Sequence, residues 1–172
     1  RVSLWTGLVQ ACRENLRRQQ TRVRMFEIGK KFLLRGDGEL REIETLAGIA
    51  TGARWPEQWG SAREALDFYD VKGDVESVLA LTADAASVRF EADSLSCLRP
   101  GRSAGIYRGA NTVGWLGELH PQIVKALNLP STVLLFELET DGALVCKPLK
   151  FNKLSRFPTV RRDLAIVINE SV

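Results

Sequence analysis

Apolar residues recur at helical spacing over the first part of the chain. Leu4, Leu8, Val9, Cys12 and Leu16 fall on one side of an α-helix, and charged side chains occupy the opposite side. Because one face is apolar and the other is charged, the pattern predicts an amphipathic helix that packs against a core.

Shorter apolar runs separated by turn residues follow this helix. Met25–Ile28 and Phe32–Leu34 predict strand, Arg35–Gly38 supplies turn residues, and Leu46–Ala50 predicts a second strand. The segment is therefore expected to form an antiparallel hairpin.

A second helix is expected over Val71–Leu79, where apolar residues return at helical spacing. It is entered through Asp67 and Asp70, and carboxylates are favourable at a helix start because they cap it and interact well with its dipole. Two carboxylates three residues apart are also compatible with a metal site or an acid/base pair. Capping explains Asp67 and Asp70 at least as well as that alternative.

The rest of the patterned chain predicts further short elements. They are a strand near Val88–Phe90, a tight turn at Arg99–Ala104, a hairpin of Ile106–Tyr107 with Val113–Gly117, a helix from Pro121 to about Asn128, and a strand over Val133–Glu139. The order of helix, hairpin, helix, strand, hairpin, helix and strand indicates an α+β fold with an antiparallel sheet.

The loop before the second predicted helix contains two tryptophans, at Trp55–Pro56 and Trp59–Gly60. We expect both indoles to cover hydrophobic surface, because large aromatic rings are most favourable when buried. Stacking of the indoles on nucleobases is the alternative.

The composition is that of a chain with a buried core, with 45% hydrophobic and 26% charged residues in 172. This excludes disordered and low-complexity classes. No apolar run approaches the length of a membrane span, so we expect no membrane partner. The start lacks an initiator Met and any signal-peptide pattern, which predicts an excised fragment of a cytoplasmic protein.

The potential metal ligands are sparse and scattered. Cys12, Cys97 and Cys146 stand far apart and are odd in number, which favours a reducing compartment over a disulfide framework. With His120 as the single histidine, we expect no metal site.

Charge is segregated along the sequence, although the net charge is only +3. Residues 1–35 hold nine basic and two acidic side chains, residues 36–146 hold nine and seventeen, and residues 147–172 hold six and two. The simplest interpretation is a set of solvated faces, or basic ends that meet an acidic partner. Contact with a nucleic acid is the alternative.

A composition break begins at Lys147, where a basic stretch without acids extends to Lys153. We expect a core domain over residues 1–146, a linker over 147–156 and the truncated start of a second domain over 157–172. Within the second domain, Asp163–Ile168 predicts a strand.

Six ordered segments of the chain carry a family resemblance. They are Val2–Leu8, Met25–Phe32, Phe68–Glu76, Arg99–Ala104, Gly117–Pro121 and Ser155–Ala165. Together they resemble the C-terminal part of the beta subunit of bacterial phenylalanyl-tRNA synthetases. The blocks Phe-Tyr-Asp-Val-Lys-Gly and Phe-Pro-x-x-Arg-Arg-Asp are the most specific.

The resemblance implies a class II synthetase-like core that has lost catalysis, followed by the opening strand of a ferredoxin-like anticodon-binding domain. In that family the beta core packs against a catalytic alpha subunit in an alpha-two, beta-two heterotetramer. The alpha active site uses ATP and Mg²⁺ to attach phenylalanine to tRNA-Phe, so no cofactor is implied for this chain. The editing module of the beta subunit is implied to lie upstream.

The resemblance makes Arg156, Arg161 and Arg162 candidate tRNA contacts. One position departs from the family pattern: Arg99 stands where the family usually has His before Pro-Gly. Any role of that His is therefore not carried over.

A working class II site needs two arginines that clamp the ATP phosphates, one in an Arg-x-acid strand and one in a glycine-containing strand that leads into a helix. Arg24 precedes Glu27 by three residues, so strand alternation should place them on opposite faces. Arg89–Glu91 and Arg161–Asp163 fit the triplet but lack the neighbouring elements. Gly36–Arg41 mimics the second motif, but its place between two strands favours a hairpin turn.

Other candidate site residues are also better explained by structural roles. Ser103 has no nearby His in the sequence to support a nucleophile, and His120 before a proline suits a strand-to-helix turn. Arg99, Gly101 and Arg102 are compatible with an anion site, but a tight turn is favoured. We therefore expect no catalytic residue.

The leading hypothesis is a non-catalytic scaffold that buries an apolar face against the alpha subunit and helps to position tRNA. One alternative is an independent RNA-binding module that uses the three arginines of the C-terminal segment. The other is a core that still activates an amino acid.

Overall fold

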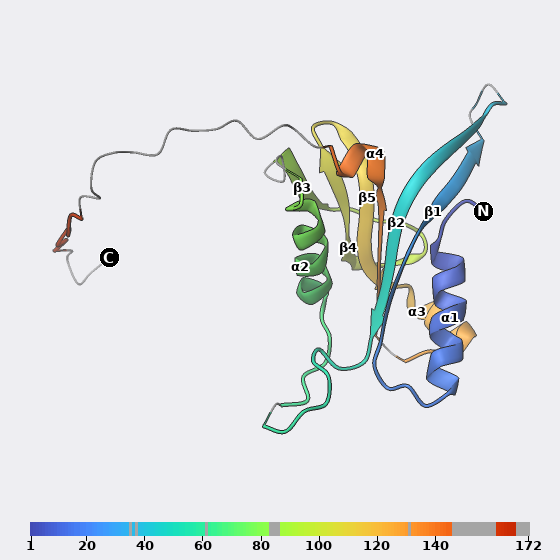
Figure 1. Ribbon diagram of the computed structural model, residues 1–172, viewed down its shortest axis with the longest axis horizontal. Helices are drawn as coiled ribbons and strands as arrows, with labels where there is room; N and C mark the ends of the chain where they lie inside the picture. Colours follow the sequence, from blue (N-terminus) through green and yellow to red (C-terminus); the bar gives the residue numbers. More distant parts are fainter. Residues whose placement is uncertain are drawn as a thin grey trace.

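The core of the molecule is a six-stranded, fully antiparallel sheet with the strand order β1-β2-β6-β5-β4-β3 (Figure 1). The computed structural model describes residues 1–34, 36, 38–60, 62–82, 87–130, 132–145 and 161–167. The strands are β1 (Val23–Leu34), β2 (Leu40–Thr51), β3 (Val88–Ala92), β4 (Leu98–Arg108), β5 (Asn111–Leu119) and β6 (Val133–Glu139). The predicted α+β class with an antiparallel sheet is confirmed.

The two longer helices cover opposite faces of this sheet (Figure 1). The helices are α1 (Trp5–Arg17), α2 (Phe68–Leu79), α3 (Pro121–Leu127) and α4 (Thr140–Ala143). Alternation along β6 shows the division, since Val133 and Leu135 pack with α1 whereas Leu134 and Leu138 pack with α2. We call these surfaces the α1 face and the α2 face.

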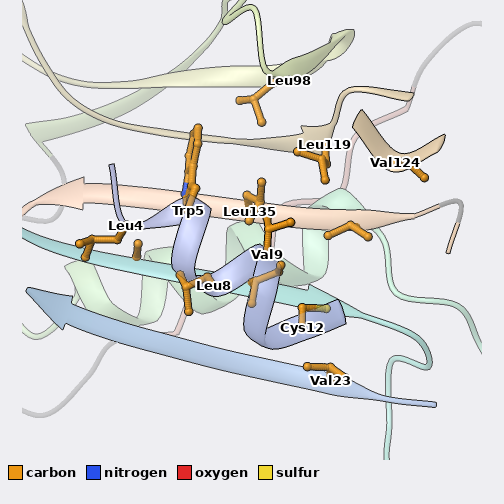
Figure 2. Close-up of a cluster of buried hydrophobic side chains, with 13 residues drawn as sticks. Leu4, Trp5, Leu8, Val9, Cys12, Val23, Leu98, Leu119, Val124 and Leu135 are labelled. Atoms are coloured by element: carbon orange, nitrogen blue, oxygen red, sulfur yellow. The ribbon is translucent and has the colours of Figure 1, made fainter. Parts of the chain in front are cut away.

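The predicted apolar stripe of α1 is buried against the α1 face. Leu4 and Cys12 are fully buried, and Leu8 and Val9 are nearly so. Figure 2 shows these side chains in one cluster with Leu135 of β6. Burial raises the pKa of the Cys12 thiol to about 11, so the thiol is neutral at physiological pH and packs as a small hydrophobic group.

The start of α2 is a capping box. The Asp70 backbone N–H donates to the Asp67 carboxylate at 2.9 Å, and the Asp67 N–H donates to the Asp70 carboxylate at 3.0 Å. Asp70 also pairs with Arg54 at 2.7 Å. Capping is confirmed, and these bonds account for both carboxylates.

The tight turn predicted at Arg99–Ala104 is wrong, because this segment lies inside β4. Between the pairs Leu98–Leu119 and Ser103–Gly117 the register advances five residues on β4 but only two on β5. Gly101 takes a φ of +75° within this irregularity. Gly101 therefore has the unusual backbone conformation that the sequence suggested, but it lies in a bulge of a continuing strand and not in a turn.

Residues 161–167 have irregular backbone and exposed side chains, so the strand predicted over Asp163–Ile168 is absent from its described part. Leu164, Ile166 and Val167 are 83%, 71% and 98% exposed. A strand needs a neighbour for its backbone hydrogen bonds, and residues 161–167 pair with no strand in the described part of the chain. Ile168, the linker over 147–156 and residues 157–160 lie outside the described residues, so the domain division stays a prediction.

Replacing Asp67 by Ala should lower the free energy of unfolding of the domain by about 1 kcal/mol, because the Asp70 N–H at the start of α2 loses its acceptor. Urea denaturation followed by circular dichroism measures this change. Ser77→Ala is the control, since Ser77 lies on the exposed side of the same helix and bonds only to the Gly73 carbonyl. Equal stability of Asp67→Ala and the unmodified domain would contradict the capping role.

Candidate functional site

A buried ion cluster lies at the centre of the α1 face. The Lys31 ammonium of β1 is 3.0 Å from a carboxylate oxygen of Glu137 and 3.0 Å from one of Glu139, both on β6. Lys31 is 9% and Glu137 is 7% exposed. A charge is tolerated at such depth only when it is paired.

The second oxygen of Glu137 fixes the start of α1. It accepts hydrogen bonds from the Ser3 hydroxyl at 2.7 Å and from the Leu4 backbone N–H at 3.1 Å. The Trp5 indole N–H donates to the Phe136 carbonyl at 2.8 Å beside them. Both oxygens of Glu137 are thus engaged, which makes this carboxylate a structural anchor and a poor general base.

A second buried carboxylate sits beside the irregularity in β4. Glu118 is 3% exposed, and its two oxygens lie 2.9 Å from Arg99 and 3.4 Å from Arg102. Both guanidinium groups therefore face an internal acid. At the candidate anion site of Arg99, Gly101 and Arg102, both arginines are thus paired with the same carboxylate of the protein.

A pocket of about 560 Å³ lies between α2 and the β3–β4 edge of the sheet. Its lining combines aromatic and charged residues: Asp67, Phe68, Tyr69, Lys72, Phe90, Glu91, Ala92, Gly101, Arg102, Ser103 and Ala104. Lys72 pairs with Glu76 and lies 4.7 Å from the centre of the Phe90 ring. The Ser103 hydroxyl donates to the Asp93 carbonyl at 2.6 Å, so it is held as a structural donor.

Groups with shifted pKa values are scattered and have local causes. Burial raises the pKa of Cys97, and the hydrogen bond from Tyr107 lowers the pKa of Asp93. On the surface, the hydrogen bond with Glu42 raises the pKa of Lys30. The same hydrogen bond raises the pKa of Tyr107, so the shifts of Asp93 and Tyr107 come from one surface pair.

The two candidates for the first clamp arginine, Arg24 and Arg89, lie at opposite edges of the sheet, and the candidate for the second, Arg41, lies on β2. Arg24 is on β1 and Arg89 is on β3, and four strands stand between them. At the usual spacing of neighbouring strands this separates their backbones by about 24 Å. Arg41 pairs with Leu33, nine residues along β1 from Arg24 and so about 30 Å away, and three strands stand between Arg41 on β2 and Arg89 on β3. Neither candidate therefore converges with Arg41 on one triphosphate.

Arg24 and Arg89 also have partners within the protein. Arg24 pairs with Asp74 of α2 at 2.8 Å, whereas Glu27 pairs with Arg1 beside the start of α1. The predicted placement of Arg24 and Glu27 on opposite faces is therefore confirmed. Arg89 pairs with Glu91 and donates to the Gly109 carbonyl.

Two other candidate site residues, Arg41 and His120, lie where the sequence predicted a hairpin and a strand-to-helix turn. Arg41 lies in β2, paired with Leu33 of β1, so the glycine-rich segment before it joins two strands as predicted. His120 is the N-cap of α3, where its Nδ1 accepts a hydrogen bond from the Gln122 N–H at 3.2 Å. Both observations place these residues in structural roles.

The prediction that the two loop tryptophans cover hydrophobic surface is wrong. Trp55 is 53% exposed and Trp59 is fully exposed. The reason is that Leu66, which is 3% exposed, fills the buried position at the end of this loop, where its N–H bonds to the Gly52 carbonyl. The loop is fixed by this contact, and both indoles face outward.

The three arginines proposed to contact tRNA fall in the C-terminal segment. Arg161 and Arg162 are exposed on irregular backbone. Arg156 lies outside the described residues. Their contact with tRNA stays a prediction.

Four buried or half-buried charged residues were missed by the sequence analysis: Lys31, Glu118, Glu137 and Glu139. A signal was present for both glutamates, since Glu137 interrupts the apolar run of a predicted strand and Glu118 stands between Gly117, the last residue of another, and Leu119. Their partners were not identifiable, because the pairing depends on strand order. Within the described ranges, no group of three or more His, Cys, Asp or Glu side chains is arranged to hold a metal ion.

Residues 1–140 match the family model described as the phenylalanyl tRNA synthetase beta chain CLM domain. The chain belongs to this family. The family expected from the six ordered segments is thereby confirmed. Among the described residues of this CLM domain, no helix is long and apolar enough to cross a membrane.

Curated relatives extend the match over nearly the whole chain. The CLM domain sequence is 51% identical to the phenylalanine–tRNA ligase beta subunit of Methylococcus capsulatus, over 98% of this chain and 21% of that protein. It is 44% identical to the same subunit of Pseudomonas putida, over 100% of this chain and 22% of that protein. The chain thus spans about a fifth of the length of these relatives.

A solved structure supports the synthetase-like architecture. The CLM domain resembles PylSc of Desulfitobacterium hafniense, a pyrrolysyl tRNA synthetase, with a TM-score of 0.53 and 18% identity. The match covers 80% of this chain and 46% of that one. At this identity the likeness shows a shared fold, which is the sheet architecture expected of the core.

Replacing Glu137 by Gln should lower the free energy of unfolding of the CLM domain by about 2 to 3 kcal/mol, because buried Lys31 keeps only Glu139 as a partner. Chemical denaturation measures the change. Glu42→Gln is the matched control, since it removes one acid from the exposed Lys30–Glu42 pair and should leave stability nearly unchanged. Equal effects of the two substitutions would show that the buried cluster is no anchor.

Proposed function

We propose that this CLM domain is a non-catalytic scaffold in the beta subunit of phenylalanine–tRNA ligase. In the proposed enzyme, a cytoplasmic alpha-two, beta-two heterotetramer, the alpha subunit holds ATP and Mg²⁺ and attaches phenylalanine to tRNA-Phe. The CLM domain contributes by packing against the alpha subunit and by helping to position the tRNA.

The observation that carries this proposal is the distribution of guanidinium groups over the sheet. Nucleotide activation in a class II fold needs arginines that converge on the phosphates. Here Arg41 lies about 30 Å along the β1–β2 ladder from Arg24, and three strands stand between Arg41 and Arg89. Arg24 and Arg89 also each pair with a carboxylate of this chain. Glu137, which is central on the α1 face, is saturated by Lys31 and the start of α1.

Exposed apolar side chains support a role in assembly. On β1, Phe26 is 72% and Ile28 is 69% exposed, and the end of the β1–β2 hairpin exposes Leu34 and Leu40. Monomeric proteins rarely leave such groups in water without a partner. This edge of the sheet is therefore suited to a protein interface.

The C-terminal segment is the part of the chain that we propose to contact tRNA. The family resemblance assigns residues 157–172 to the start of a ferredoxin-like anticodon-binding domain. Arg156, Arg161 and Arg162 would then approach the tRNA backbone, since phosphate contacts are made mainly by arginine and lysine. The exposure of Arg161 and Arg162 is compatible with this role.

Substitution of Arg41 or Arg89 by Ala in the beta subunit should leave kcat/KM for aminoacylation by the reconstituted holoenzyme within about twofold of the unmodified value. Lys125→Ala, which removes an exposed cation of α3, is the matched control. The beta subunit without alpha should give no ATP–pyrophosphate exchange. If beta alone catalyses the exchange and Arg41→Ala or Arg89→Ala abolishes it, the domain is an amino-acid-activating core and the scaffold proposal is wrong.

A further inference from the structure

Two of the segments that carry the family resemblance meet at the pocket beside α2. Phe68–Glu76 makes up most of α2, Arg99–Ala104 is the bulged part of β4, and α2 runs alongside this edge of the sheet (Figure 1). Both segments line the hollow of about 560 Å³, which we call the α2–β4 pocket. Sites for small molecules have volumes of about 300 to 1,000 Å³, so the pocket has the size of such a site.

Aromatic rings form much of the wall of the α2–β4 pocket. Phe68 and Tyr69 come from the first turn of α2, with their ring centres 5.6 Å apart in an edge-to-face arrangement, and Phe90 comes from β3. The Lys72 ammonium lies 4.7 Å from the centre of the Phe90 ring. Walls of this kind favour an aromatic ligand, because rings gain energy from edge-to-face and offset-stacked contacts.

A surplus of positive charge borders the same pocket. Arg99 and Arg102 share the Glu118 carboxylate, so two guanidinium groups and one carboxylate leave one positive charge. The Glu118 side chain is 4% exposed, whereas the Arg102 side chain is 62% exposed and lines the pocket. A guanidinium has five donors in a planar fork. Arg102 can therefore hold a ligand carboxylate while it keeps its contact with Glu118.

The other ionisable residues of the lining have partners within the protein. They are Lys72 with Glu76, Glu91 with Arg89, and Asp67 with the backbone N–H of Asp70. The first two pairs are neutral as units, and the charge of Asp67 faces the positive end of the α2 dipole. The surplus charge at Arg102 therefore favours an anionic ligand over a cationic one.

We propose that the α2–β4 pocket binds a small aromatic carboxylate. The ring of the ligand packs against Tyr69 and Phe90, and its carboxylate accepts hydrogen bonds from the Arg102 guanidinium. The proposal adds a ligand site to the domain and does not depend on contact with the alpha subunit or with tRNA.

The test compares two probes on the full-length beta subunit. 2-Naphthylacetate is the aromatic carboxylate, and 2-naphthylacetamide has the same ring system without the charge. The carboxylate should saturate with a dissociation constant of about 1 mM, which is ordinary for a ligand of this size. It should bind about tenfold more tightly than the amide, because hydrogen bonds between charged groups are stronger than those of a neutral group. Isothermal titration calorimetry measures both constants.

Three variants assign the binding to the pocket. Arg102→Met should raise the dissociation constant of the carboxylate about tenfold and leave that of the amide unchanged, while Glu118 keeps Arg99 at 2.9 Å. Tyr69→Ala should weaken both probes, because it removes part of the wall, and the 75% exposure of Tyr69 makes this change tolerable for the fold. Arg17→Met is the matched control, since the Arg17 side chain is 64% exposed on α1, on the opposite face of the sheet.

Four results would each overturn the proposal. They are no saturation by 2-naphthylacetate, equal affinity for the two probes, equal effects of Arg102→Met and Arg17→Met, and protection of Tyr69 from oxidative footprinting in the beta subunit without a probe. The last result would show that another part of the beta subunit fills the pocket. Circular dichroism of each variant confirms that a loss of binding is not a loss of fold.

Discussion

The Glu137 carboxylate is the interaction on which the arrangement of the α1 face depends. One of its oxygens neutralises Lys31 of β1, and the other accepts from the Ser3 hydroxyl and the Leu4 amide at the start of α1. An unpaired charge at this depth would cost several kcal/mol. Glu137 therefore couples the formation of the sheet to the position of α1, because the helix and the two strands must be in place together for the carboxylate to be satisfied.

The same principle governs the charge at β4 and β5, and it supports the proposal that this fold has no nucleotide site. Glu118 pairs with Arg99 and Arg102, as Glu137 pairs with Lys31, so the cations near the buried carboxylates have partners within the chain. A class II sheet that bound ATP would need such cations aimed at an external phosphate. The exposed apolar side chains available for contacts include Phe26 and Ile28 of β1 and Trp55 and Trp59 of the loop between β2 and α2.

Local patterns predicted the local features well. The apolar stripe of α1 and the Asp67 cap of α2 depend on residues within a few positions of one another, so periodicity and capping chemistry sufficed. The bulge at Gly101 was mistaken for a turn because the same residues serve both. Lys31 and Glu137 could not be paired from sequence, since their contact crosses β2 and depends on the strand order. The exposure of Trp55 and Trp59 followed from Leu66, whose anchoring of the loop is a tertiary contact.

Titration of the isolated beta subunit with Mg²⁺-ATP, followed by calorimetry, tests most directly whether this sheet has lost its nucleotide site. Among the described residues, the candidate arginines do not converge on one phosphate group, which predicts no saturable binding that maps to residues 1–140. The scaffold account would be contradicted by saturable binding of Mg²⁺-ATP that protects residues on the sheet surface and that is lost when Arg24 or Arg89 is substituted.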